Sequence, residues 1–227
     1  LPVPPHLPRH RQGRMILRSR QPVTLIGGGP LGPDDLAQAL ALAPTVAAAD
    51  GGADQALARG LTPAAVWGDF DSLSEAARAA IPAENLHRIA EQDSTDFEKC
   101  LSRIDAPLVI GLGFSGARQD HFLAALSTLA RRLGPPCILL AGDDAIALAP
   151  SEIALDLPPG TRVSLFPMGP ARGRSQGLEW PIDGLDLAPD GRVGTSNRAT
   201  GPLHLQIQGP TLLILPRAHL ADLAQAL

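Results

Sequence analysis

The sequence AVWGDFDS, residues 65–72, joins an apolar segment typical of a buried strand to a pair of aspartates. Side chains alternate along an extended chain, so Asp69 and Asp71 point to one side and can reach the same metal ion or its water shell. A second acidic cluster, DSTD at residues 93–96, also follows a short apolar run, and its two aspartates are one helical turn apart. Neighbouring carboxylates repel one another unless a cation neutralises them, and Mg²⁺ prefers oxygen ligands. The two clusters therefore predict a divalent-cation site.

Composition and charge are those of an ordinary globular chain. Of the 227 residues, 44% are hydrophobic, which is enough to bury a sizeable core in one large domain or two small ones. The net charge is −4, and because the first twenty residues contribute +5, the remainder stands at −9. Nucleic-acid binders normally carry the opposite charge, and 3% aromatic residues leave little for bases to stack on. We therefore expect no nucleic-acid partner.

The N-terminal segment and the two cysteines bear on location. No apolar run approaches roughly 18 residues, and the opening LPVPPHLPRHRQGR lacks the apolar core of a signal peptide, so we expect no membrane partner. We interpret residues 1–20 as a flexible leader outside the fold, with Met15 as a candidate natural start. Cys100 and Cys137 lack CxxC spacing, which argues against a zinc site or a disulfide framework and favours a reducing cytoplasm.

From residue 23 to about residue 149, short apolar runs alternate with longer amphipathic stretches, the pattern of a parallel sheet covered by helices. The expected strands are residues 23–26, 45–49, 64–67, 86–90, 108–112 and 137–140. The expected helices are residues 34–42, 53–59, 74–80, 95–104 and 120–132.

The second half of the chain changes character. Short alternating segments separated by Pro and Gly turns predict antiparallel strands at residues 151–157, 162–166, 203–208 and 211–215, and residues 218–227 predict a closing helix. We therefore predict an α/β protein with an N-terminal Rossmann-like parallel sheet, helices on both of its faces, and a small antiparallel β-sandwich domain after it. The predicted domains are residues 21–149 and 150–227.

Polar residues follow the predicted strands of the first half. Ligands of open α/β sheets bind outside the carboxyl ends of the strands, so these groups should converge on one crevice. They are Asp50, Gly51 and Gly52 after the second strand, Asp69 and Asp71 after the third, Gln92 and Asp93 after the fourth, Gly113, Gly116, Arg118, Asp120 and His121 after the fifth, and Gly142, Asp143 and Asp144 after the sixth.

Several of these residues also have plain structural interpretations. The second acidic cluster fits a helix start, because Thr95 and Glu98 form a capping box. Ser72 fits the N-cap of the next helix. Arg118 fits a surface arginine as well as a phosphate ligand, and His121 fits a structural histidine as well as an acid or base. Both kinds of interpretation stay open at this point.

A dinucleotide-binding fingerprint is the sharpest rival interpretation. GGGPLG at residues 27–32 matches GxGxxG after a strand, and Asp50 follows about twenty residues on. The match is weakened by Pro30, which sits in the loop whose N–H groups should approach pyrophosphate, and by Pro33 in the early helix. No P-loop sequence occurs and Lys99 is the single lysine, so phosphate neutralisation falls to metal, backbone amides and arginine, with Arg118 best placed.

Six motifs together resemble the thiamine pyrophosphokinase family. They are ADGGAD (49–54), GDFDS (68–72), DSTDFEKCL (93–101), GFSGARQDH (113–121), GLEWP (177–181) and TSN (195–197), and the resemblance runs from about residue 23 to residue 215. It implies an α/β catalytic domain followed by a small β domain, a homodimer, and Mg²⁺-dependent transfer of diphosphate from ATP to thiamine. The implied products are AMP and thiamine diphosphate, and the implied partners are ATP and thiamine, with the thiamine pocket at the dimer interface.

The resemblance also implies roles for individual residues. It makes Asp69, Asp71, Asp93 and Asp96 the metal ligands and Asp71, Asp96 and Arg118 the catalytic residues, with Asp71 or Asp96 accepting the hydroxyl proton. The implied nucleotide-binding residues are Asp50, Gly51, Gln92, Thr95, Lys99, Asp120 and His121, and the implied thiamine-binding residues are Trp180, Ser196 and Asn197. Ala117 and Glu179 depart from the family, in which a glycine and a lysine are usual at these positions.

Two other functions and one structural alternative stay open on the residues alone. The same fold could serve a diphosphokinase for a pterin-type hydroxymethyl heterocycle, or a non-catalytic nucleotide sensor whose β domain binds a partner. Trp180 fits a core tryptophan, and TSN fits a turn, as well as a heterocycle-binding surface.

Overall fold

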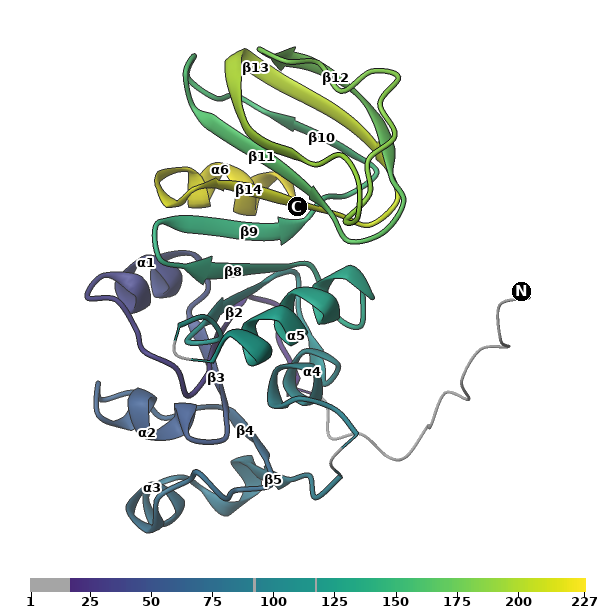
Figure 1. The fold of residues 1–227 in the computed structure, drawn as a ribbon. Coiled ribbons are helices and arrows are strands. Elements are labelled where there is room, and N and C mark those ends of the chain that lie inside the picture. Colours follow the sequence, from purple (N-terminus) through teal and green to yellow (C-terminus); the bar gives the residue numbers. More distant parts are fainter. Residues whose placement is uncertain (1–16, 92, 117) are drawn as a thin grey trace, which may run out of the picture.

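The structure is a computed structural model that describes residues 17–91, 93–116 and 118–227. Figure 1 shows a mixed α/β fold in which helices surround the sheet of the first half and the second half is built mostly of strands. The strands of the first half are β1 (Leu17–Arg18), β2 (Val23–Ile26), β3 (Thr45–Ala49), β4 (Ala65–Gly68), β5 (Leu86–Arg88), β6 (Ile104–Asp105), β7 (Val109–Leu112) and β8 (Cys137–Ala141). Its helices are α1 (Asp35–Leu42), α2 (Gly52–Leu57), α3 (Glu75–Ala80), α4 (Asp96–Leu101) and α5 (Gln119–Ala130), with the 3₁₀ turn η1 (Ala83–Asn85).

The second half is an antiparallel arrangement closed by a helix. Its elements are β9 (Asp144–Leu148), β10 (Glu152–Leu155), β11 (Arg162–Pro167), β12 (Arg172–Leu178), β13 (Gly194–Gln208), β14 (Thr211–Pro216), the 3₁₀ turn η2 (Arg217–His219) and α6 (Leu220–Ala226). Within the described part of the chain, no helix combines the length and the apolar character needed to cross a membrane.

The predicted elements of the first half are confirmed to within a few residues. The sheet has β2, β7 and β8 as parallel neighbours and β3, β4 and β5 as a second parallel set, with β3 packed beside β2. Buried side chains alternate between two helical layers, as a parallel sheet covered on both faces requires. The helices α1 to α3 pack on Ile26, Val46, Ala48, Val66, Ile110 and Ile138, whereas α4 and α5 pack on Leu25, Ala47, Ala49, Trp67, Val109 and Leu139.

A tight hairpin joins the two halves. Ala141 pairs with Asp144 across a two-residue turn in which Gly142 has φ +60°, a conformation that favours glycine. The Asp144 carboxylate pairs with Arg162 rather than facing a crevice. These residues form the β8–β9 turn, and the expectation that Gly142, Asp143 and Asp144 join the ligand site stays a prediction.

The hydrogen-bonded sheet continues through this hairpin. From β9 it passes to β14, β11, β13 and β10, with every neighbouring pair antiparallel. It therefore crosses the predicted boundary near residue 150, and the division into two domains stays a prediction. β13 is long enough to pair with β11 through its first part and with β10 and β12 through its second, and it bends at Gly201, where φ is +151°.

The fold begins earlier than expected. Leu17 and Arg18 form the strand β1, which pairs in parallel with β6, so residues 17–20 belong to the fold and not to a leader. The Ser19 hydroxyl lies 3.3 Å from the hydroxyl of Thr45 at the start of β3. The rest of the predicted leader, residues 1–16, lies outside the described residues.

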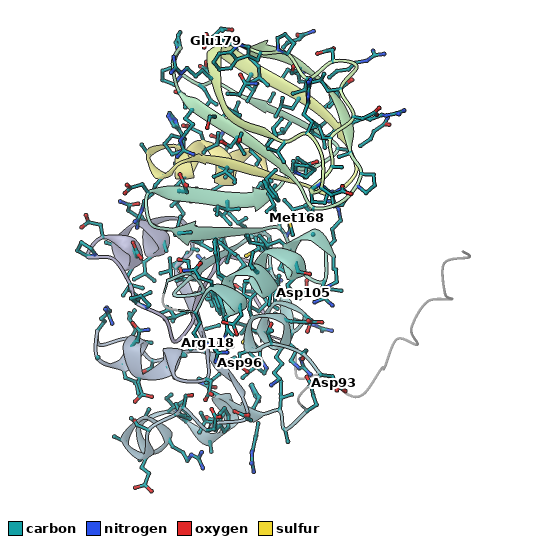
Figure 2. All side chains as sticks on the ribbon, viewed as in Figure 1. Asp93, Asp96, Asp105, Arg118, Met168 and Glu179 are labelled. Carbon is teal, nitrogen blue, oxygen red and sulfur yellow. The ribbon has the colours of Figure 1, made fainter. Side chains whose placement is uncertain are left out.

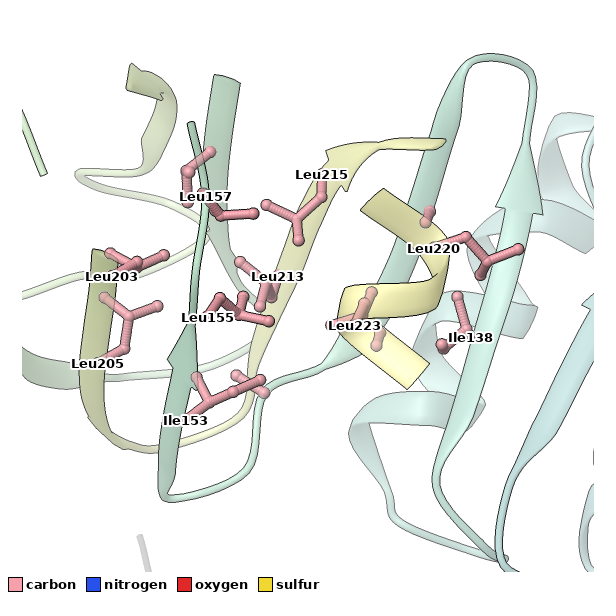
Figure 3. Close-up of a cluster of buried hydrophobic side chains, with 14 of the residues drawn as sticks. Ile138, Ile153, Leu155, Leu157, Leu203, Leu205, Leu213, Leu215, Leu220 and Leu223 are labelled. Atoms are coloured by element: carbon pink, nitrogen blue, oxygen red, sulfur yellow. The ribbon is translucent and has the colours of Figure 1, made fainter. Parts of the chain in front are cut away.

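One apolar core spans both halves. Figure 3 shows Ile138 of β8 close to Leu220 and Leu223 of α6, with Leu213 and Leu215 of β14 leading on to the strands of the second half. All of these side chains are nearly or fully buried. The second half is therefore packed onto the first through α6 and β14, as well as linked to it by the sheet.

Leu213→Ala tests this continuity. The Leu213 side chain is 0% exposed, on a strand paired with both β9 and β11, and truncation of a buried leucine typically costs about 2–5 kcal/mol. We expect chemical denaturation to show one cooperative transition whose unfolding free energy falls by about that amount. Leu123→Ala on α5 is the matched control, since Leu123 is 64% exposed, and it should change little. Two transitions, only one of them shifted by Leu213→Ala, would contradict a continuous core.

Candidate active site

Three carboxylates meet where two neighbouring strands end. Asp50 follows β3, and Asp69 and Asp71 follow β4, its parallel neighbour. One carboxylate oxygen from each of the three residues lies within 4.8 Å of the others. The predicted convergence of polar groups at the carboxyl ends of the strands is therefore observed for these three residues, which we call the acidic cluster. The sequence analysis predicts Asp50 as a nucleotide-binding residue and not as a metal ligand.

Asp50 is the buried member of the acidic cluster. It is 3% exposed, its Oδ1 has no hydrogen-bond partner among the described residues, and its Oδ2 accepts the backbone N–H of Ser72 at 3.4 Å. Burial raises the pKa of Asp50 to about 6, with further contributions from the neighbouring Asp71 and the charge of Asp96, while the Ser72 bond opposes the rise. A buried carboxylate oxygen without a partner is costly, and a cation would satisfy it.

The backbone at the acidic cluster is held in uncommon conformations. Asp50 has φ +43°, and Phe70, which lies between Asp69 and Asp71, has φ +67°. Left-handed conformations of non-glycine residues cost energy and gather at functional sites. Gly68 leaves the space that Asp50 occupies, because a Cβ there would lie 2.8 Å from the Asp50 Cβ. Gly68, the first residue of the GDFDS motif, is therefore a part of the site to which the sequence analysis assigns no role.

The hydroxyls around this loop serve other purposes than expected. Ser74, not Ser72, caps α3: its Oγ accepts the N–H of Ala77 at 3.0 Å. The Ser72 hydroxyl instead donates to Asp71 Oδ1 at 3.0 Å. The prediction of Ser72 as an N-cap is wrong by two residues, because the helix begins only at Glu75, directly after Ser74, whose backbone is extended.

The second acidic motif of the sequence, DSTD at residues 93–96, lies at the start of α4. Thr95 is the N-cap and accepts the N–H of Glu98 at 3.3 Å, so the predicted helix start is confirmed, whereas the Glu98 carboxylate pairs with Arg131 instead of completing a capping box. Asp96 accepts a hydrogen bond from the buried ammonium of Lys99 at 3.3 Å. Asp93 is exposed, and its backbone N–H donates to the Glu91 carboxylate at 2.9 Å.

Asp93 and Asp96 thus lie in different environments, the first exposed and the second paired with the buried Lys99. Asp96 is near enough for its charge to raise the pKa of Asp50, although neither residue joins the group of three close carboxylates. Figure 2 shows Asp93, Asp96 and Arg118 together in the half of the molecule that carries the parallel sheet. Gln92, predicted to bind the nucleotide, lies outside the described residues.

Arg118 forms a bidentate ion pair just before α5. Its Nε lies 3.2 Å from Asp120 Oδ1 and one terminal nitrogen lies 2.6 Å from Oδ2, with both side chains about two-thirds exposed at 66% and 65%. The pair raises the pKa of Arg118 and lowers the pKa of Asp120. His121 is exposed in the first turn of the same helix. The guanidinium therefore presents its free edge to solvent, and a phosphate must share it with or take it from Asp120.

The glycine-rich loop after β2 does not have the form of a dinucleotide-binding loop. The N–H of Gly27 donates to the Leu112 carbonyl at 2.7 Å, and the N–H of Gly29 donates to the Gly113 carbonyl at 2.9 Å. These amides are thus used within the protein, and α1 begins only at Asp35. The pyrophosphate-binding arrangement, in which loop amides point at the ligand from a helix start, is not formed.

The predicted thiamine-binding residues lie on two neighbouring strands, with Trp180 just after β12 and Ser196 and Asn197 near the start of β13. Trp180 is 53% exposed, so its interpretation as a core tryptophan is wrong. Asn197 is buried, and its amide is used to hold the backbone of Trp180: Nδ2 donates to the Trp180 carbonyl at 2.6 Å and Oδ1 accepts the Trp180 N–H at 3.1 Å. Ser196 is exposed with φ +60°. Asn197 therefore presents the indole ring rather than its own amide.

The two predicted halves of the site are far apart in one chain. Figure 2 places Glu179, the neighbour of Trp180, at the end of the β part remote from Asp93, Asp96 and Arg118. The segment that carries Glu179 and Trp180 is therefore remote from Asp93, Asp96 and Arg118 of the same chain.

Comparison with known proteins bears on the family. The sequence model described as thiamin pyrophosphokinase, catalytic domain, matches residues 36–138, a range that contains the four motifs of the first half and neither GLEWP nor TSN. A comparison with curated protein sequences finds no match.

Solved structures of the same fold carry that name. The thiamin pyrophosphokinase from Candida albicans is 16% identical with a TM-score of 0.72, covering 87% of this chain and 89% of that chain. The enzyme from Geobacillus thermodenitrificans is 22% identical with a TM-score of 0.72, covering 86% and 97%. Yeast thiamin pyrophosphokinase is 17% identical with a TM-score of 0.71, covering 96% and 90%. Residues 36–138 thus match the thiamin pyrophosphokinase catalytic-domain family, which confirms the resemblance that the motifs indicate.

Proposed function

We propose that this protein is a thiamine pyrophosphokinase, which transfers the diphosphate group of ATP to the hydroxyl of thiamine and releases AMP. The observation that carries the proposal is the acidic cluster, in which a buried carboxylate oxygen of Asp50, beside Asp69 and Asp71, has no hydrogen-bond partner in the described part of the chain. The cluster lies within the residues that match the family's catalytic domain. Family membership supports the nucleotide and the acceptor, and the cluster supports the metal.

The donor set fits Mg²⁺. Hard oxygen ligands in a partly buried setting are what this ion takes, and the acidic cluster offers only carboxylates. We propose Asp50, Asp69 and Asp71 as the protein ligands, with Asp96 contributing charge and Asp93, on the exposed side, the weakest of the predicted ligands. When bound, Mg²⁺ would neutralise phosphate oxygens and so lower the barrier to attack at the β phosphorus.

The remaining roles fall to residues of the same half. Asp71 or Asp96 would accept the proton of the thiamine hydroxyl as the bond to phosphorus forms. The cations Lys99 and Arg118 would stabilise the negative charge that develops on the leaving AMP. Lys99 is suited to this because its ammonium is held against Asp96 in a buried position, whereas Arg118 must first loosen its exposed pair with Asp120.

We further propose a homodimer in the cytoplasm with the thiamine site at its interface. Two observations support this arrangement. Trp180 is an exposed large apolar side chain whose backbone is held by Asn197, and its neighbour Glu179 lies remote from Asp93, Asp96 and Arg118 of the same chain. A second copy that places its indole over the acidic cluster would complete the site. Cys100 and Cys137 are buried free thiols, as a reducing compartment allows.

One assay tests the proposal. The protein is incubated with MgATP and thiamine, and the products are separated; AMP and thiamine diphosphate in equal amounts support it. Product formation from a hydroxymethyl pterin and not from thiamine would assign the acceptor to the other heterocycle. ATP binding without AMP formation would make the protein a nucleotide sensor.

Asp71→Asn tests the role of the acidic cluster. Because Lewis-acid stabilisation of phosphoryl transfer is worth several kcal/mol, we expect kcat to fall at least about 100-fold in the coupled AMP assay. The thermal unfolding temperature should stay near that of the wild type, since Asp71 is exposed. Asp190→Asn, an exposed aspartate of the β part, is the matched control and should keep full activity. Full activity in Asp71→Asn would contradict the metal assignment.

Asp50→Asn tests the buried carboxylate through pH. Since the folded pKa is raised from 3.8 to about 6, protonated Asp50 favours the folded state at low pH, and this stabilisation is lost as pH rises through about 6. In metal-free buffer the neutral variant should therefore unfold at a higher temperature than the wild type at about pH 7.5 and at a similar temperature at about pH 4.5. Added Mg²⁺ should stabilise the wild type and not the variant. A temperature difference that does not vary with pH would refute the account of Asp50.

Trp180→Ala tests the acceptor half. Loss of an aromatic face that stacks on a heterocycle typically costs about 1–3 kcal/mol, so we expect the thiamine KM to rise about tenfold or more with the ATP KM little changed. Trp180→Phe keeps a ring and should recover most of the loss. A rise in the ATP KM with an unchanged thiamine KM would show that the two halves are assigned the wrong way round.

A further inference from the structure

The glycine loop, residues 27–32, has no role in the proposed chemistry, yet it is tightly held. We propose that Gln55 is a positioning residue that uses this loop to fix the loop bearing Arg118, residues 113–118, relative to the acidic cluster. The inference rests on the proposed function for its effect on catalysis, and on hydrogen bonds and packing for its structural part.

The Gln55 amide holds the glycine loop at two points. Its Nε2 donates to the carbonyl of Gly27 at 3.0 Å and to the carbonyl of Gly29 at 2.7 Å. An amide nitrogen carries two hydrogens, so both donors are used on the loop. The residue is half-buried, where unpaired carbonyls would be costly. Gln55 therefore fixes the middle of the loop rather than binding a ligand.

The glycine loop in turn lies against the Arg118 loop, backbone to backbone. Besides the bond from the Gly29 N–H to the Gly113 carbonyl, a Cβ at Gly27 or Gly29 would lie 2.7 Å from that carbonyl oxygen. Gly116 meets Pro30 in the same way, since a Cβ there would lie 2.9 Å from the proline ring. Because the glycines bring the two loops into direct contact, we expect the loops not to move independently.

The short helix α2 carries Gln55 and begins two residues after Asp50 of the acidic cluster. Asp50 and Gly51 lead directly into α2, and Gln55 follows about one helical turn later. Gly52 anchors the helix against β2, because a Cβ there would lie 2.1 Å from the Ile26 carbonyl oxygen. A chain of direct contacts thus runs from Asp50 through Gln55 and the glycine loop to the base of the Arg118 loop.

The far end of the glycine loop is fixed independently. The Gly32 N–H donates to Asp35 Oδ2 at 2.7 Å, and Asp35 is paired with the guanidinium of Arg217 from the C-terminal segment. Arg217 also donates from Nε to Gln38 Oε1 at 2.8 Å. Because this anchor ties the loop to the fold without Gln55, removal of the Gln55 amide should loosen the middle of the loop and leave its far end in place.

Gln55→Met tests the proposal, since it keeps length and removes both donors. Amide hydrogen exchange is followed in peptides that cover residues 27–32 and 113–119, and MgATP and thiamine kinetics are measured on the same samples. We expect exchange in both segments to accelerate about tenfold, as the loss of hydrogen bonds of ordinary strength allows, and kcat/KM for MgATP to fall about tenfold. Gln55→Lys, whose ammonium can donate to both carbonyls, should restore both quantities. Gln225→Met on α6, an exposed glutamine, is the matched control and should change neither.

A double variant separates positioning from general destabilisation. If Gln55 acts through the Arg118 loop, Gln55→Met should lower kcat/KM much less in an Arg118→Ala background than in the wild type. Equal losses in the two backgrounds, or unchanged exchange in residues 113–119, would overturn the proposal. Should the wild type form no AMP, the proposed function fails while the exchange data still decide whether Gln55 holds the two loops.

Discussion

Repulsion among the carboxylates of Asp50, Asp69 and Asp71 is the constraint on which the rest of the structure depends. One carboxylate oxygen of each lies within 4.8 Å of the others, and Asp50 Oδ1 is buried without a hydrogen-bond partner among the described residues. Such an arrangement is unfavourable for the protein alone: burial, and then the neighbouring Asp71 and the charge of Asp96, raise the pKa of Asp50. The surrounding chain maintains it nonetheless, with left-handed backbone at Asp50 and Phe70 and a glycine at position 68 that leaves room for the buried carboxylate. Strain of this kind is what a cation-binding site requires before the cation arrives.

The fold places everything else relative to this cluster. Adjacent parallel strands bring Asp50 beside Asp69 and Asp71, and the start of α4 brings Asp96 and Lys99 towards them. The loop of Arg118 is fixed from the other side by glycine packing against the loop after β2. The β part, which carries the exposed Trp180, is joined to this half by a continuous sheet and core.

The sequence predicts the first half well because apolar runs and acidic residues are local signals there. Every expected strand and helix up to residue 141 is present, and the acidic residues after β3 and β4 do converge. The second half is predicted less well. The strand β12, RGRSQGL, carries little apolar signal because it is mostly solvent-facing, and β13 changes pairing partners along its length. The Gly142-Asp143 turn resembles a polar site loop although it is a hairpin signal.

Side-chain partners were the least predictable part of the candidate site. The amide of Asn197 has the right chemistry to bind a heterocycle, but in the structure it forms hydrogen bonds with the backbone of Trp180. Arg118 has the right chemistry to bind phosphate, and a carboxylate two residues away already pairs with it. The role of Gln55 could not be predicted from the sequence. A glutamine on a short helix belongs to no motif, and its partners are backbone carbonyls 26 and 28 residues earlier.

The most direct measurement of the central claim is a crystal structure of the protein with Mn²⁺ in place of Mg²⁺ and a non-hydrolysable ATP analogue. The account predicts an anomalous difference peak coordinated by the carboxylates of Asp50, Asp69 and Asp71, with Asp50 Oδ1 or a water bound to it in the coordination sphere and phosphate oxygens on the open side. Nucleotide bound with no metal at these three residues, or a metal held elsewhere, would contradict it.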